Sequence, residues 1–350
     1  MKIMNRLVST HLKIWKNLKY LLSKLKIIKQ NLTTANNLGL ESKAQFFSLF
    51  NDSDDLCKLH AAAKKMDARV QIIGAGTNTI FPRAFNKLVI KSSNKSISEK
   101  RVKKDIYVSA GAALIWDDLL ILCGKKYCGL ANMAGIPGTV GAAPVQNIGA
   151  YGVELSDLLE EVLCFDLETQ KEVVLSTSDC RFNYRSSIFQ SNPHLIILQV
   201  TLKLSSEFKP LTTYKDLENT NPTDEANFVE IVREIRDAKL PNPKDFPNIG
   251  SFFKNPIMSD KDFQNNDKLQ NLNFQVLDDG SYKLSAAQIL EASGLKGAMI
   301  GNVGISSKHS LVLICNGLCD ATNVKNFEDL AKKTVHDKFG VILEREPIYL

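Results

Sequence analysis

NMAGIPGTVGAAPVQNIGAYG, residues 132–152, contains five of the chain's 19 glycines and no charged residue. Glycine lets the backbone adopt positive φ and approach a ligand closely, so that several N–H groups can converge on phosphate oxygens. Residues 74–78, GAGTN, offer the same freedom directly after an apolar strand at 70–73. We expect both segments to hold a phosphate-bearing ligand, with the amides of Gln146 and Asn147 at the polar edge of a flat heterocycle.

Neither segment fits the common nucleotide-binding motifs. Residues 74–78 lack the third glycine and the ribose-binding acid of a dinucleotide fingerprint, and residues 132–152 contain no Gly-Lys-Ser/Thr of a P-loop. A Rossmann site is therefore disfavoured. A glycine cluster can also form a tight crossover that binds nothing, but five glycines among 21 uncharged residues favour binding.

Composition indicates a globular protein with a basic tail. A chain of 350 residues, 44% hydrophobic and 23% charged, can bury a sizeable core in two or three domains. The net charge is +6, but the first thirty residues hold eight Lys and Arg and no acid, which leaves −2 for the rest. This balance argues against a nucleic-acid-binding surface on the folded body.

The tail has a pattern of its own. Apolar side chains recur at helical spacing from Ile14 to Ile28, and lysines fill most of the other face. The pattern predicts a basic amphipathic helix, without the apolar run of a signal peptide or a spanning helix. Two interpretations remain open: contact with a membrane surface, or an extension that the fold does not use.

The cysteines indicate a reducing compartment. Their number is odd, they are scattered, and no secretory signal accompanies them, so we expect reduced thiols in a cytoplasm. The pairs 123/128 and 315/319 are too loosely spaced for a zinc site, and we expect no metal. The seven are Cys57, Cys123, Cys128, Cys164, Cys180, Cys315 and Cys319.

From about residue 31 the pattern is that of an α+β enzyme. Leu240-Pro241-Asn242-Pro243 ends a long helix expected at 224–237 and marks a domain boundary. Further helices are expected at 61–65, 116–122, 285–293 and 324–339, and strands at 70–73, 88–90, 106–108, 162–166, 171–175, 195–202 and 310–315.

Five ordered segments resemble one family. Residues 134–152 resemble the flavin-binding signature of the MurB family, the UDP-N-acetylenolpyruvoylglucosamine reductases, also called UDP-N-acetylmuramate dehydrogenases. The others resemble its first flavin-phosphate loop (72–80), arginine motif (180–189, CRFNYRSSIF), serine motif (250–256, GSFFKNP) and carboxyl-terminal acidic motif (339–346, FGVILERE). The resemblance runs from about residue 31 to 350.

The resemblance implies an α+β fold: an FAD-binding module of the vanillyl-alcohol-oxidase type, made of two α+β subdomains, followed by a substrate domain. We expect an N-terminal extension at 1–30, the subdomains at 31–92 and 93–238, and the substrate domain at 239–350. It also implies a cytoplasmic, monomeric flavoprotein in which NADPH reduces FAD. The reduced flavin then converts UDP-N-acetylglucosamine enolpyruvate to the peptidoglycan precursor UDP-N-acetylmuramate.

The resemblance also carries residue roles. Arg185 matches the arginine that stabilises charge on the substrate, Ser251 the proton donor, and Glu346 the second acid of the terminal motif. Tyr214 matches the tyrosine with which the larger subtype covers the uridine diphosphate. Lys239, Asn255 and Glu291 match other substrate positions. The implied FAD-binding residues are Gly74, Ala75, Gly76, Thr77, Asn78, Gly138, Thr139, Gly141, Ala142, Asn147, Gly149 and Gly152.

The chain departs from the family at 287–297. Gln288 replaces a tryptophan and Ala292 replaces a glutamine expected to hold the substrate, which puts the details of substrate binding in doubt. We assign His309 and His336 no catalytic role. A flavoprotein with another acceptor, and a flavin- or sugar-nucleotide-binding module without turnover, are the alternatives.

Overall fold

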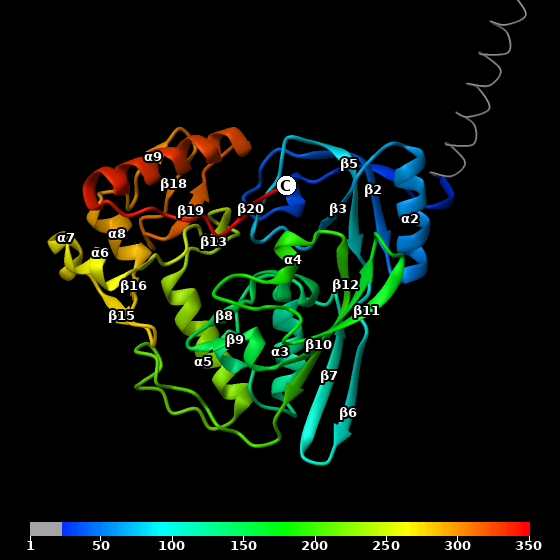
Figure 1. The fold of residues 1–350 in the computed structure, drawn as a ribbon, viewed down its shortest axis with the longest axis horizontal. Helices are drawn as coiled ribbons and strands as arrows, with labels where there is room; N and C mark the ends of the chain where they lie inside the picture. Colours follow the sequence, from blue (N-terminus) through cyan, green and yellow to red (C-terminus); the bar gives the residue numbers. More distant parts are fainter. Residues whose placement is uncertain (1–22) are drawn as a thin grey trace, which may run out of the picture.

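The computed structural model describes residues 23–350, which form three neighbouring units in chain order (Figure 1). Most of the amphipathic helix expected over 14–28 falls outside these residues, because positions 1–22 are not described. Strand β1 (Ile28–Asn31) begins two residues before the expected end of the extension and pairs antiparallel with β2 (Lys43–Phe50). Ile27 is buried beside it, so the end of the basic tail contributes to the first sheet.

The first unit is a sheet with strand order β1-β2-β5-β3. Strand β5 (Ala84–Ser92) runs parallel to both β2 and β3 (Val70–Ile73). Helix α2 (Ser53–Lys65) is capped at its N-terminus by Asp52, whose carboxylate accepts a hydrogen bond from the N–H of Asp55. Its buried face packs on β5 and also on the second sheet, so the two units share a core.

The second unit is an antiparallel sheet with strand order β11-β10-β12-β7-β6. Trp116, at the start of α3, is fully buried in its core, where α3 packs beside α5. The elements are β6 (Ile97–Val102), β7 (Asp105–Gly111), α3 (Trp116–Gly124), β10 (Leu159–Asp166), β11 (Lys171–Ser176), α4 (Ile188–Ser191), β12 (Leu195–Leu204) and α5 (Glu225–Lys239).

The glycine-rich segment crosses this unit as short pieces without a long helix or strand. The 3-10 turns η2 (Ala131–Met133) and η3 (Val140–Gln146) are followed by a small hairpin of β8 (Gly149–Ala150) and β9 (Val153–Glu154). Two further 3-10 turns, η1 (Thr33–Ala35) and η4 (Leu155–Asp157), lie elsewhere.

The third unit is built on a four-stranded sheet, β13-β19-β18-β17. Helix α9 (Ala321–Phe339) buries Val324, Phe327, Ala331 and Val335, spaced as one face of a helix, and ends at Gly340 with φ 65°. The strands are β13 (Asn248–Ser251), β17 (Met299–Ile300), β18 (Val303–Ile305) and β19 (Val312–Cys315). A smaller sheet of β14 (Ile257–Met258), β16 (Tyr282–Leu284) and β15 (Phe274–Val276) lies with α6 (Asp260–Gln264), α7 (Asp267–Gln270) and α8 (Ala286–Ala292).

The end of the chain returns to the first unit. Strand β20 (Ile348–Tyr349) pairs in parallel with β4 (Thr79–Ile80), which follows the first glycine loop (Figure 1). The expected helix break is also present, because α5 ends at Lys239 and Leu240 takes an extended conformation before Pro241.

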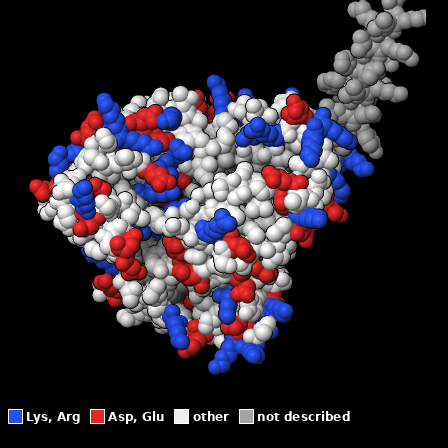
Figure 2. Space-filling model, in the orientation of Figure 1, with Lys and Arg blue, Asp and Glu red and all other residues white. Residues whose placement is uncertain are grey.

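Lys and Arg side chains are interspersed with Asp and Glu over the face in Figure 2, in line with the small net charge of the body. None of the helices in residues 23–350 is long and apolar enough to cross a membrane. All seven cysteines lie in this range as free thiols, and burial raises the pKa of Cys123, Cys164 and Cys180 to about 12.

Candidate active site

The first glycine loop is a tight turn between β3 and β4. Gly76 has φ 70°, and a Cβ at this position would lie 2.2 Å from the carbonyl oxygen of Ala35. Only glycine allows this approach, since both the left-handed conformation and the missing side chain are needed. The loop is tied to the second segment by the Thr77 hydroxyl, which donates to the carbonyl of Pro137 at 3.2 Å.

The second segment lies close against β7. A Cβ on Gly141 would be 2.5 Å from the Cβ of Ala112, so η3 can pack here only with glycine at this position. Gly138 has φ 142°, and Asn147 closes η3 in the left-handed region with φ 44°. These conformations turn the backbone of the segment toward the first loop.

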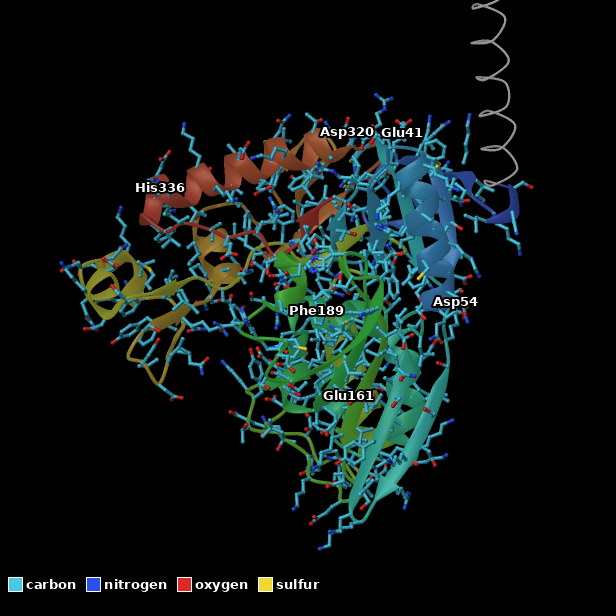
Figure 3. All side chains as sticks on the ribbon, turned by 45° about the vertical axis from the view of Figure 1, so that its right-hand side comes forward. Glu41, Asp54, Glu161, Phe189, Asp320 and His336 are labelled. Atoms are coloured by element: carbon cyan, nitrogen blue, oxygen red, sulfur yellow. The ribbon has the colours of Figure 1, made fainter. Side chains whose placement is uncertain are left out.

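A cavity of about 370 Å³ lies between the two loops. Residues expected to bind the cofactor line it as a continuous set: Gly74, Ala75, Gly76, Thr77, Asn78, Thr139, Gly141 and Ala142. The opposite walls are largely apolar and include Phe189, which Figure 3 labels near the centre of the molecule, and Ile348 of β20. This mixture of backbone amides and apolar walls suits a large, flat, phosphate-bearing ligand.

A second cavity, of about 240 Å³, adjoins the first. Arg185, Ser251 and Glu346 all line it, although they come from three separate parts of the chain. Gly138 and Gly149 line it as well. The two cavities share a wall of five residues: Thr77, Asn78, Thr139, Ala142 and Gln146.

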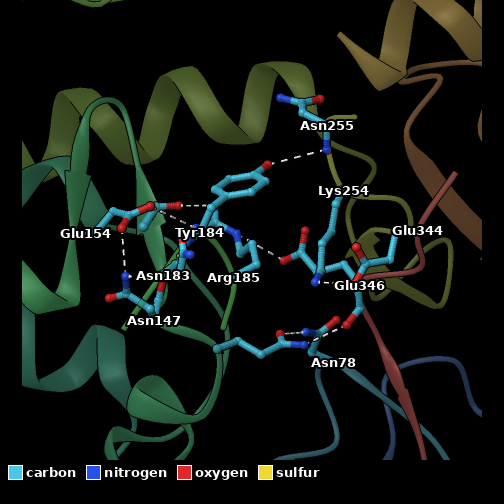
Figure 4. Close-up of polar contacts among 12 residues, drawn as sticks. Asn78, Asn147, Glu154, Asn183, Tyr184, Arg185, Lys254, Asn255, Glu344 and Glu346 are labelled. Atoms are coloured by element: carbon cyan, nitrogen blue, oxygen red, sulfur yellow. Dashed lines mark hydrogen bonds and ion pairs between the residues drawn. The ribbon is translucent and has the colours of Figure 1, made fainter. Parts of the chain in front are cut away.

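Arg185 has a strained backbone conformation, with φ 52°. The glycine-rich segment 132–152 holds its side chain. Its guanidinium donates to the carbonyl oxygens of Gly149 at 2.7 Å and Asn147 at 3.4 Å. Its Nε lies 3.3 Å from Oε1 of Glu346 (Figure 4). The guanidinium is therefore fixed in position before any ligand binds.

Glu346 is partly buried, with its side chain 18% exposed beside the 19% of Arg185. Burial raises the pKa of its carboxyl, and the charges of Arg185 and Lys254 oppose that rise. Its backbone N–H donates to the carbonyl of Phe252 at 2.9 Å, and its own carbonyl accepts from Nε2 of Gln146 at 2.6 Å. A carboxyl with a raised pKa can carry a proton and donate a hydrogen bond.

Ser251 is the last residue of β13, where it pairs with Val312 of β19. The preceding Gly250 has φ 71°, so the turn places Ser251 at the edge of the second cavity. Two of the expected substrate-binding residues have partners of their own. Lys239 forms an ion pair with Asp216, and the side chain of Asn255 accepts from the N–H of Ala286.

Tyr184 links the arginine motif to the third unit. Its hydroxyl accepts from the backbone N–H of Asn255 at 3.4 Å, as Figure 4 shows. Nζ of Lys283 lies 3.7 Å from the centre of its ring, and the guanidinium carbon of Arg185 lies 5.3 Å from it. The ring thus separates two cations and packs between the units.

The other expected substrate-site residues, Tyr214, Lys239, Asn255 and Glu291, are not among the residues that line the second cavity. Tyr214 is half exposed, with its ring edge-on to Tyr151 at 5.4 Å between centroids. Glu291 forms an ion pair with Lys296 at 2.9 Å. Asn147 and Gly152, expected to bind the cofactor, also lie outside both linings.

The structure adds one residue that the sequence analysis did not select. Arg236 lines the second cavity, and burial lowers the pKa of its guanidinium. Its Nε is buried and has no hydrogen-bond partner among residues 23–350. The sequence could have indicated Arg236, because it precedes Lys239 by three positions on α5 and residues three apart share a helix face.

The unusual residues of α8 take local roles. The side-chain oxygen of Gln288 accepts from the N–H of Asn273 at 2.6 Å, and the carbonyl of Ala292 accepts from Lys338. His309 is partly buried beside Lys239 and Glu291, and its Nδ1 accepts from the N–H of Leu311. His336 is exposed at the outer end of α9 (Figure 3).

Comparison with known proteins gives consistent matches over both parts of the chain. Residues 242–350 match a family model described as UDP-N-acetylenolpyruvoylglucosamine reductase, C-terminal domain, and residues 44–174 match an FAD binding domain. The reductase of that name from Neisseria gonorrhoeae is 35% identical over 92% of this chain and 96% of its own. The one from Bdellovibrio bacteriovorus is 37% identical over 91% and 97%.

A solved structure has the same fold. The crystal structure of the UDP-N-acetylenolpyruvylglucosamine reductase from Thermus caldophilus superimposes with a TM-score of 0.65 and 21% identity. The match covers 93% of this chain and 99% of the other. Together with the FAD binding domain at 44–174, this confirms the expected α+β fold class.

Proposed function

This chain belongs to the UDP-N-acetylenolpyruvoylglucosamine reductase family, and on that basis we propose which of its residues carry out the reaction. The activity is that of an FAD- and NADPH-dependent oxidoreductase. It reduces UDP-N-acetylglucosamine enolpyruvate to UDP-N-acetylmuramate in peptidoglycan precursor synthesis. The observation that carries the residue assignment is that Arg185, Ser251 and Glu346 line one cavity, which shares a wall with the glycine-lined one.

The glycine-lined cavity is the proposed FAD site. Its fit is supported by residues 74–78, which line the cavity, and by Gly76 and Gly141, whose missing Cβ lets the two loops pack against Ala35 and Ala112. Both glycine loops lie in the part of the chain that matches the FAD binding domain. The chemistry that FAD supplies when bound is transfer of a hydride from NADPH to the substrate's carbon–carbon double bond.

Arg185 is the proposed electrostatic stabiliser. Addition to an enolpyruvyl group builds negative charge on the carboxylate of the substrate. A guanidinium can meet that charge with two parallel hydrogen bonds, and the carbonyls of Gly149 and Asn147 hold it in place to do so. Little reorganisation is then needed as the charge develops.

Glu346 assists Arg185 in this proposal. Burial raises the pKa of its carboxyl, and in its protonated form this carboxyl can donate a hydrogen bond to the substrate carboxylate. Its contact with Nε of Arg185 also orients the guanidinium. One buried acid thereby serves as a donor and as a positioning group.

Ser251 is the proposed proton donor. The hydroxyl gives its proton to the substrate carbon next to the carboxylate, while the hydride adds to the other carbon, so the double bond becomes saturated. The resulting alkoxide is reprotonated from solvent. Lys239, Asn255, Glu291 and Tyr214 remain the proposed contacts for the rest of the UDP-sugar.

We propose that the enzyme works as a monomer in the cytoplasm. Free cysteines are typical of a reducing compartment. Solution scattering of the FAD-loaded protein measures the oligomeric state directly.

One spectroscopic experiment tests the function. The purified protein should be yellow, lose its flavin absorbance with NADPH, and regain it when UDP-N-acetylglucosamine enolpyruvate is added. Loss without recovery would support a flavoprotein with another acceptor. No loss would support a binding module without turnover.

A further inference from the structure

A single side chain joins the two glycine loops to the catalytic acid. Gln146 is the last residue of η3 and is 7% exposed. Its Oε1 accepts a hydrogen bond from Nδ2 of Asn78 in the first loop. Its Nε2 donates to the backbone carbonyl of Glu346 at 2.6 Å. Residues 68 and 200 positions away in the sequence thus meet at one amide.

These contacts are part of a closed ring. The N–H of Ile348 donates to the carbonyl of Asn78 at 3.2 Å. Asn78 therefore contacts the terminal segment through its backbone and contacts Gln146 through its side chain. The N–H of Glu346 is taken by the carbonyl of Phe252 at 2.9 Å, next to Ser251. The backbone of Glu346 is therefore fixed on both sides, by Gln146 and by the serine loop.

The next residues of the same segment hold the partner of Glu346. The carbonyl oxygens of Asn147 and Gly149 accept from the guanidinium of Arg185, which then lies 3.3 Å from the carboxyl of Glu346. Residues 146–149 thus determine the positions of both members of this pair. A small shift of a catalytic group costs rate steeply, so a link of this kind has kinetic consequences.

We propose that Gln146 is a positioning residue, which places Glu346 relative to Arg185 through its hydrogen bond to the Glu346 carbonyl. The inference rests on the proposed role of Glu346. Gln146 acts on the step that uses substrate and not on the reduction of FAD by NADPH. The oxygen and the nitrogen of its side-chain amide contact Asn78 and Glu346. The sequence analysis had instead predicted a contact of this amide with the edge of the heterocycle.

The test compares half-reactions of the FAD-loaded enzyme in a stopped-flow spectrometer. Gln146→Met keeps the length of the side chain and removes both hydrogen bonds. We expect flavin reoxidation by UDP-N-acetylglucosamine enolpyruvate to slow about tenfold, with flavin reduction by NADPH within about twofold of wild type. Gln199→Met, at a half-buried glutamine of β12 outside both linings, is the matched control and should change neither rate.

A double-mutant cycle with Glu346→Gln separates positioning from a direct role. If Gln146 acts through the Glu346 carboxyl, Gln146→Met should slow reoxidation by less than about twofold in the Glu346→Gln background. The full tenfold loss in both backgrounds would overturn the proposal. So would weakened FAD binding with equal slowing of both half-reactions, since this would mean that Gln146 serves the flavin.

Gln146→Glu provides a second variant if the methionine variant does not fold. A carboxylate still accepts from Asn78 but cannot donate to the Glu346 carbonyl, so the same selective loss is expected. Wild-type enzyme that is not reoxidised by the substrate would refute the proposed function and this inference together. If the wild-type enzyme turns over normally and the effects of Gln146→Met and Glu346→Gln on the reoxidation rate simply multiply in the double mutant, the inference alone would be refuted.

Discussion

Replacing Arg185 with lysine tests the site most directly. Both residues are unbranched cations and both adopt the left-handed backbone at φ 52° with similar difficulty, so the change leaves backbone strain and net charge nearly unaltered. What changes is the arrangement of the side chain's hydrogen-bond donors. The guanidinium contacts Gly149, Asn147 and Glu346 from three different nitrogens, whereas an ammonium group cannot reproduce that planar arrangement.

The magnitude follows from the contacts. The ammonium group of lysine can keep one strong hydrogen bond. It cannot make the forked contact with the substrate carboxylate, and it lacks the fixed orientation of the guanidinium. A hydrogen bond to a charged group contributes about 1.5–3 kcal/mol, and the contact with Asn147 at 3.4 Å is too long to count fully. A loss of about 3 kcal/mol from the transition state corresponds to slowing of roughly 10²-fold.

The assay is single-turnover reoxidation of the reduced flavin by UDP-N-acetylglucosamine enolpyruvate. Flavin reduction by NADPH should stay within about threefold of wild type, because the charge that Arg185 meets develops on the substrate. Arg181→Lys is the matched control, since Arg181 is an exposed arginine of the same segment with φ 47°. Reoxidation within threefold of wild type, or equal slowing in the control, would refute the assigned role.

Four further changes have defined outcomes. Ser251→Ala should slow reoxidation by about three decades and leave flavin reduction nearly intact in the same stopped-flow assay, and equal slowing of both steps would exclude a proton donor. Gly76→Ala should weaken FAD binding at least about tenfold in a fluorescence titration, because left-handed strain alone costs about 1–2 kcal/mol and the new Cβ also collides. Glu328→Gln, which breaks a buried contact with Arg345 at 3.1 Å, should destabilise the fold by about 3 kcal/mol in denaturant unfolding; an unchanged midpoint would contradict this. Removal of residues 1–22 keeps β1, so turnover should stay within about twofold, and loss of co-sedimentation with anionic vesicles would favour the membrane interpretation of the tail.

Local patterns were sufficient for the first glycine loop and for helices α3, α5, α8 and α9, whereas only the last turns of α2 were expected and α4, α6 and α7 were not. Residues 74–78 follow a short apolar strand and contain Gly76, which needs positive φ, so the turn is indicated by its own sequence. The expected helix at 324–339 lies within α9, because its apolar residues keep one face over nineteen residues. Leu240-Pro241 likewise ended α5 as expected.

Other elements left no local signal. Strand β2, KAQFFSLF, was missed because its hydrophobicity does not alternate as its burial does: the polar Ser48 is buried, whereas the apolar Leu49 is exposed. The contact of Gln146 with Glu346 joins residues 200 positions apart, and no spacing rule predicts such a pair. The resemblance identified Arg185, Ser251 and Glu346 as site residues, but only the fold shows that Arg236 lines their cavity and that Lys239 is engaged by Asp216.

The pairing of β20 with β4 has a consequence for biosynthesis. The first loop is made early in translation, yet Ile348, Tyr349 and Leu350 belong to the wall of the same cavity. A ribosome-bound intermediate that has completed the two sheets of the cofactor module would still lack that wall and the carboxyl of Glu346. A chain truncated just before Ile348 should therefore keep most of its core but leave the proposed FAD cavity without part of its wall.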